Sequence, residues 1–331
     1  MTPDGLVPNF GAATGFKSSD RSQPPVGAMA VWNIYQRHQE KSFIRECYPK
    51  LLSWNQWFYN NRMRKDGALS WGSNPYTGTL GCVWETEGVN DRFGAALESG
   101  LDNSPMYDDI PFNANTHLLE LSDVGLTGLY INDCMYLIKL GTALGDDTTQ
   151  LQQRMEKAKN GLQNLWCQET GLFLNKRTDT GEFSHRISPT NFYALFSDTV
   201  TAEQAERSVN EHFYNPEEFW GDYILPSIAR NDPAYPDQSY WRGRIWAPMN
   251  YLVYRAFAAS GQQNACEDLA AKSQELLMKE WTLYGHVHEN YCANTGMGCG
   301  VANSDKFYHW GGLLGYIPLL EHFLNDSRSI E

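Results

Sequence analysis

The segment from Glu98 to Asp109 holds the residues of this chain whose types and spacing best suit acid–base chemistry. It carries four carboxylates in twelve positions, namely Glu98, Asp102, Asp108 and Asp109. Gly100 and the Asn-Ser-Pro run at 103–105 are turn formers, so we expect Asp102 on a bend and not inside a helix. A carboxyl group held on a rigid bend can donate a proton to a bound molecule or take one from it.

Aromatic residues flank this segment on both sides, with Trp84 and Phe93 before it and Tyr107 and Phe112 after it. Apolar surroundings keep a carboxylic acid protonated near neutral pH, which is the state that a general acid needs. The alternative is that Asp102 closes an Asx turn and that the acids beside it are solvated at the surface. From this segment alone the two interpretations have equal weight.

The composition indicates a globular chain with a large core and an acidic surface. The chain has 331 residues, a net charge of −13 and 42% hydrophobic residues, and we find no linker that would divide it, so we expect one domain. The acidic balance argues against nucleic acid and anionic membranes as partners. A small neutral or weakly anionic substrate fits, provided that arginines line the site. The 13% aromatic content suits either a large aromatic core or the stacking of sugars on rings.

The seven cysteines are scattered, odd in number and free of any CxxC pair. This pattern favours reduced thiols in a cytoplasmic enzyme over a disulfide framework, and no spacing of histidine around Cys292 and Cys299 is typical of zinc. We therefore expect no metal and no cofactor. We also find no signal peptide and no apolar stretch long enough to span a membrane.

Apolar residues recur with helical spacing along most of the chain, in pairs of segments joined by short breaks. Few stretches alternate as strands do, and long aromatic loops separate the pairs. Helical hairpins arranged in a ring would bury one helix of each pair and gather their loops at one rim, as in an α/α toroid. The helices are expected at about 26–37, 42–60, 113–144, 148–166, 187–196, 201–211, 244–260, 262–280 and 305–324, with long loops at 61–112, 212–243 and 284–304 and a small hairpin at 168–185.

Five motifs together resemble the catalytic domain of glycoside hydrolase family 63, and they follow one another in the order expected of that family. They are Asp20-Arg-Ser-Gln-Pro-Pro25, Glu98-Ser-Gly-Leu-Asp102-Asn-Ser-Pro105, Tyr240-Trp-Arg-Gly-Arg-Ile-Trp-Ala-Pro-Met-Asn250, His288-Glu289-Asn290-Tyr291 and Trp310-Gly-Gly-Leu-Leu-Gly315. The resemblance implies an all-α fold, an (α/α)6 barrel, and an inverting α-glycosidase. Its short subgroup implies mannosylglycerate or glucosylglycerate as the small-molecule substrate.

By this resemblance Asp102 takes the place of the general acid and Glu289 that of the general base. Inversion needs two carboxyl groups, because one protonates the leaving oxygen while the other activates a water on the opposite face of the ring. The two groups are then expected roughly 6.5–9.5 Å apart. Glu289 could instead be an ordinary loop glutamate, but the neighbours His288, Asn290 and Tyr291 can all form hydrogen bonds, which favours a built polar site.

The same motifs supply candidate substrate-binding residues, each with a structural alternative. Arg21 and Gln23 are expected at the sugar; the alternative is that both cap the following helix, and for Arg21 this could be the only role. Trp241 is expected to stack on a sugar, whereas Trp246 suits the core equally well. Arg242 and Arg244 suit bidentate binding of a carboxylate, although one of them could pair with an acid instead. The full set of binding candidates is Arg21, Gln23, Asn103, Tyr130, Tyr240, Trp241, Arg242 and Trp246.

The number of helices departs from the family pattern. About nine helices can be counted, whereas an (α/α)6 barrel has twelve, so we expect the first helices of the barrel to be missing from this single catalytic domain of residues 1–331. Either the chain is a fragment or a partner supplies these helices, and a homo-oligomer is a separate possibility. The alternative function is a carbohydrate-binding or inactive toroid protein that has lost catalysis.

Overall fold

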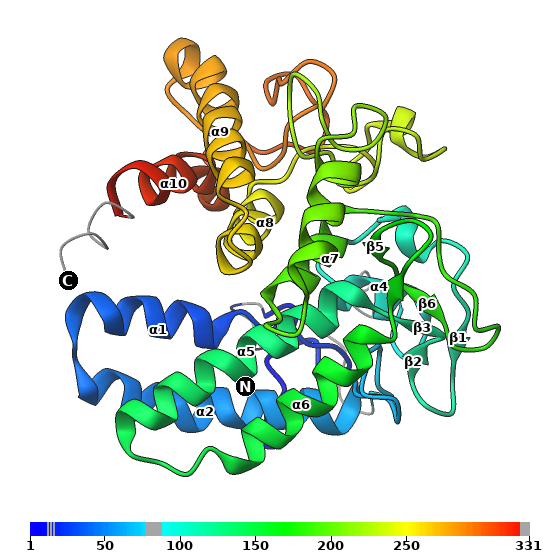
Figure 1. Ribbon diagram of the computed structural model, residues 1–331, viewed down its shortest axis with the longest axis vertical. Helices are drawn as coiled ribbons and strands as arrows, with labels where there is room; N and C mark the ends of the chain where they lie inside the picture. Colours follow the sequence, from blue (N-terminus) through cyan, green and yellow to red (C-terminus); the bar gives the residue numbers. More distant parts are fainter. Residues whose placement is uncertain (12, 14, 16, 77–87, 325–331) are drawn as a thin grey trace. The chain divides into compact units, whose positions relative to one another are not determined.

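The computed structural model describes residues 1–331 except 12, 14, 16, 77–87 and 325–331 (Figure 1). The chain forms two compact units. The first consists of Met1–Asp102, Asp109–Trp166 and Leu174–Ser184, and the second of Asn103–Asp108, Cys167–Phe173 and His185–Glu331. The prediction of a single catalytic domain stays a prediction.

Two helical hairpins build the first unit. Helices α1 (Gly27–His38) and α2 (Lys41–Asn61) form one, and α5 (Val124–Leu144) and α6 (Thr149–Gln163) form the other. Gln39 and Gly145 end α1 and α5 in left-handed conformations, with φ of 52° and 82°. Helix α5 packs against α1, α2 and α6 and is buried along most of its length, because its sequence is almost free of charges (Figure 1).

The segment before α5 is where the first unit differs from expectation. We predicted a helix from 113, but residues 112–122 form three two-residue strands, β1 (Phe112–Asn113), β2 (Leu118–Leu119) and β3 (Leu121–Ser122). Strand β1 pairs with β2, and β3 pairs with β6 (Lys176–Arg177). The helix begins only after Asp123, whose carboxylate accepts a hydrogen bond from Leu126 N at 2.8 Å and so caps the first turn.

The second unit is built around α8 (Ala247–Ala259). It packs against α9 (Gln263–Tyr284), α10 (Leu313–Leu319) and the 3₁₀ helix η2 (Pro189–Phe196). Helix α7 (Ala202–Arg207) begins with a capping box and continues as the π-helical turn η3 (Ser208–Phe213). Edge-to-face rings fill the core beside η2, namely Phe192, Phe213, Phe219 and Phe257.

The prediction of a mostly helical fold made of hairpins is confirmed, with three further differences in detail. The segment predicted at 187–196 is the 3₁₀ helix η2, which begins at Pro189 after a Ser188 capping box. The last helix is broken into η5 (His309–Gly312), α10 and η6 (Leu320–Leu324) around Gly311, Gly312 and Pro318. The expected loop at 61–112 also holds α4 (Arg92–Glu98) and the 3₁₀ turn η1 (Pro105–Tyr107).

The small hairpin expected at 168–185 is present as two turns. Strands β4 (Trp166–Cys167) and β5 (Leu172–Phe173) enclose the first, and a bridge between Lys176 and Phe183 closes the second. Among the described helices none is long and apolar enough to cross a membrane.

Candidate active site

Asp102 lies on a turn between α4 and η1, as its neighbours predicted. Ser104 caps η1 by accepting a hydrogen bond from Met106 N at 3.3 Å, which fixes the end of the turn. Asp102 itself is half-buried. Of the aromatic residues expected around it, Tyr107 is buried, Phe93 is 42% exposed and Trp84 lies outside the described residues.

Glu98 is a buried structural residue of this segment, a role that no feature of the sequence indicated. Its carboxylate is paired with Arg62, with Oε2 2.5 Å from Nε and Oε1 2.8 Å from Nη2. It also accepts hydrogen bonds from Ser22 N and Gly72 N, each at 2.8 Å. With both oxygens fully engaged, Glu98 ties α4 to the segments around 22, 62 and 72 and is not available to transfer protons.

The motif at residues 20–25 is anchored inside the first unit. Arg21 is 1% exposed, and its Nη1 lies 3.2 Å from Asp20 Oδ2, which also accepts a 2.7 Å hydrogen bond from Ser73. Burial raises the pKa of Asp20, while Arg21 and Ser73 oppose the rise. Gln23 is half-buried and donates through Nε2 to Asn9 O. The role of both candidates at a sugar stays a prediction.

Tyr130 lies in the middle of α5 and is fully buried. Its hydroxyl donates to Asn55 Oδ1 at 3.2 Å, and burial raises its pKa well above the usual value. These contacts are those of a core residue, and the expected role of Tyr130 at a substrate stays a prediction.

The second unit holds Glu289, which is 6% exposed. Tyr240 donates from its hydroxyl to Glu289 Oε1 at 3.0 Å, and Trp310 Nε1 donates to the main-chain oxygen of Glu289 at 2.9 Å. Burial raises the pKa of Glu289, and the Tyr240 hydrogen bond opposes the rise.

Asn103 fixes the loop that carries Tyr240. Its Oδ1 accepts from Trp241 N at 2.8 Å, and its Nδ2 donates to Ser239 O at 3.1 Å. Tyr240 has a φ of 58°, a left-handed conformation that is uncommon for a tyrosine. Asn103 directly follows Asp102 in the chain, so the residue after the expected acid is hydrogen-bonded to the loop that orients the expected base.

The two tryptophans of this motif stack on each other. The rings of Trp241 and Trp246 lie 3.7 Å apart at 7°, and Tyr240 meets Trp246 edge-on. Trp246 is fully buried and donates to Tyr240 O at 3.0 Å, so it belongs to the core. Trp241 is 6% exposed, and one face of its ring is covered by Trp246. Its expected role as a sugar platform stays a prediction.

Both arginines of the motif have protein partners. Arg242 bonds Asp108 through Nη1 at 2.8 Å and Asp237 through Nε at 2.7 Å, with 23% of its side chain exposed. Arg244 is buried and donates to Asn290 Oδ1 at 2.9 Å and to the main-chain oxygens of Gln238 and Ala302. Arg242 thus pairs with two acids, and its expected role in binding a substrate carboxylate stays a prediction.

Within the second unit the structure therefore brings together Asn103, Tyr240, Trp241, Trp246 and Glu289. The contact from Tyr240 to the Glu289 carboxylate was not foreseen, although both residues stood in the quoted motifs. The first unit carries Asp102, Arg21 and Gln23, with Tyr130 in its core. The separation expected between the carboxyl groups of Asp102 and Glu289 stays a prediction.

Comparison with known proteins places this chain among glycosidases. The family model described as the mannosylglycerate hydrolase MGH1-like glycoside hydrolase domain matches residues 1–310. Mannosylglycerate hydrolase MGH1 from Selaginella moellendorffii is 25% identical over 84% of this chain and 62% of the relative. The chain thus spans less than two thirds of that relative's length. A mannosylglycerate hydrolase from Thermus thermophilus is also 25% identical, over 86% of this chain and 74% of the relative.

Solved structures show the same fold. The crystal structure of the GH63 mannosylglycerate hydrolase from Thermus thermophilus in complex with glucose has a TM-score of 0.75 at 22% identity. The match covers 96% of this chain and 84% of that one. The same hydrolase in complex with Tris and D-glycerate has a TM-score of 0.73 at 21% identity, over 96% of this chain and 84% of that one. These likenesses confirm the α/α toroid fold class.

Proposed function

The chain belongs to the mannosylglycerate hydrolase MGH1-like glycoside hydrolase family, and from this premise we propose that it hydrolyses a small α-mannoside or α-glucoside with inversion. The preferred substrate is mannosylglycerate or glucosylglycerate. The observation that carries the proposal is the buried Glu289 carboxylate, which the hydroxyl of Tyr240 holds by a hydrogen bond. The loop that bears Tyr240 is in turn held by Asn103, the residue that follows Asp102 in the sequence.

Glu289 has the properties of a general base. A carboxylate whose pKa is raised by burial is a stronger base than one in water, because efficient proton transfer needs a pKa near the working pH. Tyr240 holds one oxygen of the carboxylate in a fixed direction. The carboxylate then removes a proton from the water that attacks the anomeric carbon.

Asp102 supplies the proton for the leaving oxygen. Its half-buried turn is braced by the Ser104 cap on one side and by the Glu98–Arg62 anchor on the other. In the proposed reaction the C–O bond to the aglycone breaks as the Asp102 proton passes to that oxygen. Water adds to the opposite face of the sugar and loses its proton to Glu289.

The names of the relatives support the proposal that the substrate contains glycerate. Two relatives are named mannosylglycerate hydrolases, and the structure of one such enzyme contains D-glycerate. In this chain Arg242 is a partly exposed guanidinium bonded to Asp108 and Asp237, and these two acids would compete with a substrate carboxylate.

A substrate panel with two variants tests this proposal. The unaltered chain is assayed on mannosylglycerate, glucosylglycerate, trehalose and kojibiose-type disaccharides, with released sugar measured directly. Asp102→Asn and Glu289→Gln should each lower turnover by roughly 10²–10⁴. On a substrate with an activated leaving group, which needs little protonation, the Asp102 variant should regain much of its rate and the Glu289 variant should not.

The control variants Asp109→Asn and Glu217→Gln change exposed acids of the same two types and should keep full activity. Recovery in the Glu289 variant instead of the Asp102 variant would exchange the two roles. Binding of a glycoside without hydrolysis of any substrate in the panel would favour the carbohydrate-binding alternative.

A further inference from the structure

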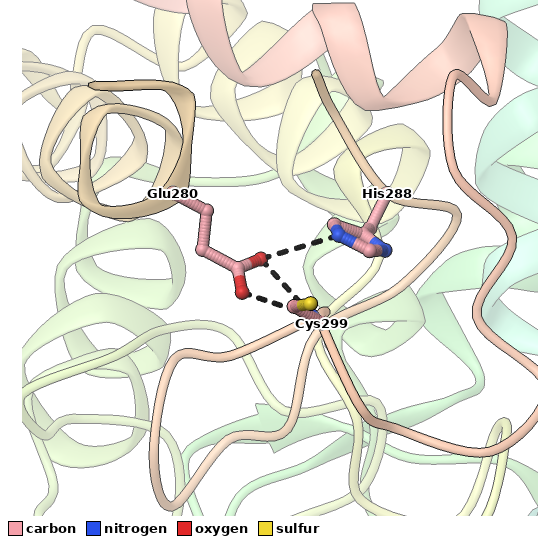
Figure 2. A group of neighbouring side chains, drawn as sticks. All are labelled: Glu280, His288 and Cys299. Carbon is pink, nitrogen blue, oxygen red and sulfur yellow. Dashed lines mark hydrogen bonds and ion pairs between the residues drawn. The ribbon is translucent and has the colours of Figure 1, made fainter. Parts of the chain in front are cut away.

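Glu280, His288 and Cys299 form a compact group in the second unit, outside the residues assigned above. Glu280 lies near the end of α9, and the other two lie in the loop that follows it; Figure 2 shows the Glu280 carboxylate directed at both. Their potential ligand atoms all lie within 4.8 Å of one another. In place of the expectation that the chain holds no metal, we propose that this group binds a zinc ion, which fixes the loop bearing Glu289 to α9.

His288 directs its ring nitrogen Nε2 at the Glu280 carboxylate, with Oε2 3.5 Å away (Figure 2). Its Nδ1 lies 3.4 Å from Ser304 O, and because a carbonyl can only accept, this contact requires the proton on Nδ1. The lone pair of a neutral ring is then on Nε2. That atom is buried and makes no hydrogen bond to any described residue, and the side chain is 1% exposed. A histidine that ligates a metal typically donates its other N–H to a carbonyl in this way.

The main-chain N–H groups of Gly298 and Cys299 hold the carboxylate of Glu280 in place. Oε1 accepts from Cys299 N at 2.9 Å, and Oε2 accepts from Gly298 N at 2.8 Å. Gly298 is required here, because a Cβ at this position would lie 2.4 Å from the His288 ring. Hydrogen bonds of this kind commonly orient a carboxylate that ligates a metal.

The spacing suits tetrahedral coordination. His288 Nε2 and Glu280 Oε2 are 3.5 Å apart. Bonds of ~2.0–2.1 Å to a tetrahedral zinc would place the two atoms ~3.4 Å apart. This contact is an ion pair only when the ring is protonated; with a neutral ring two lone pairs face each other, and a cation between them would satisfy both (Figure 2). The Cys299 sulfur is already within 4.8 Å and would need to move inward by about 1 Å.

The chemical types of the three potential ligands favour zinc over other divalent ions. A thiolate and an imidazole are poor ligands for Mg²⁺ and Ca²⁺, whereas zinc binds sulfur, nitrogen and carboxylate oxygen together. One carboxylate and one thiolate also neutralise a divalent charge, which favours its burial beside two side chains that are each 1% exposed. Three protein ligands leave one position for water.

A zinc ion bound by His288 would also restrain Glu289, because His288 immediately precedes it in the sequence. Zinc would close the loop between Glu280 and Cys299 and so limit the motion of the segment that carries Glu289. This consequence rests on the proposed function, whereas metal binding does not.

Metal content and cobalt substitution test the proposal on the intact chain without substrate. The protein is purified without a histidine tag and dialysed against zinc, and bound metal is measured by atomic spectrometry. We expect one zinc per chain. With Co²⁺ in its place we expect a thiolate-to-cobalt charge-transfer band and the intense visible bands of a tetrahedral site.

Cys299→Ser should abolish the charge-transfer band and weaken zinc binding by at least about tenfold. His288→Gln should weaken zinc binding to a similar degree. The matched control is Cys292→Ser, a half-buried cysteine of the same loop, which should bind zinc and cobalt as the unaltered chain does. Circular dichroism checks that the variants fold, and the cobalt spectrum of the unaltered chain needs no variant at all. An unaltered chain that holds no zinc, or a cobalt spectrum without sulfur ligation, would overturn the proposal.

Discussion

The hydroxyl of Tyr240 donates a 3.0 Å hydrogen bond to Oε1 of Glu289, a carboxylate that is 6% exposed. Burial raises the pKa of Glu289, and this hydrogen bond is the first of the contacts that oppose the rise. Tyr240 is thus a positioning residue that also sets how readily the proposed base ionises.

Tyr240→Phe should move the acidic limb of the pH–activity profile to higher pH. The base must be ionised to act, so activity is lost as pH falls through the pKa of Glu289. Removing a hydrogen bond to the charged form raises that pKa further. At neutral pH kcat should fall by roughly tenfold, which corresponds to the ~1.5 kcal/mol of a hydrogen bond to a charged group.

Trp310→Phe is the control for Tyr240→Phe, because Trp310 bonds only the main-chain oxygen of Glu289 in the contacts described. Its acidic limb should stay in place. Profiles of kcat/KM against pH check both variants, and an unmoved or lowered limb in Tyr240→Phe would contradict this role.

Arg242→Ala should weaken the binding of a charged substrate and leave the binding of a neutral one unchanged. If Arg242 binds the glycerate carboxylate, its loss should raise KM for mannosylglycerate by roughly 10–100-fold, the worth of a charged hydrogen bond. The neutral mannosylglycerol should show an unchanged KM. Equal losses for both substrates would mean that Arg242 only holds Asp108 and Asp237 in place.

Glu98→Gln should destabilise the fold. The substitution leaves Arg62 buried without its charged partner, which costs about 3–5 kcal/mol of unfolding free energy. Urea unfolding followed by circular dichroism measures the change. Glu46→Gln breaks the exposed Lys50–Glu46 pair and should unfold at the same urea concentration as the unaltered chain. An unchanged midpoint for Glu98→Gln would show that the buried pair contributes little.

Local signals in the sequence were enough for much of the fold. Helical periodicity placed α1, α2, α6, α8 and α9 with ends within a few residues of those observed, and the bend at Asp102 follows from its turn-forming neighbours. The strands at 112–122 escaped prediction because each is only two residues long and because some of their hydrogen bonds go to distant segments, as β3 pairs with β6. Leu119 N, for example, donates to Trp71 O.

The site was predictable in its residue types but not in its contacts. The motifs named Tyr240 and Glu289, yet nothing in the spacing of 49 positions indicates a hydrogen bond between them. The burial of Glu98 likewise depends on Arg62, 36 positions away. The pKa of Glu289 depends on how the fold excludes water from it, which no neighbouring residue reveals.

The anomeric form of the first sugar released tests the central claim of inverting hydrolysis most directly. Proton NMR during the first turnovers on mannosylglycerate or glucosylglycerate distinguishes the two anomers before they interconvert. Inversion by Asp102 and Glu289 predicts that the β-anomer appears first and that the α-anomer grows in later by mutarotation. Early release of the α-anomer would contradict the account.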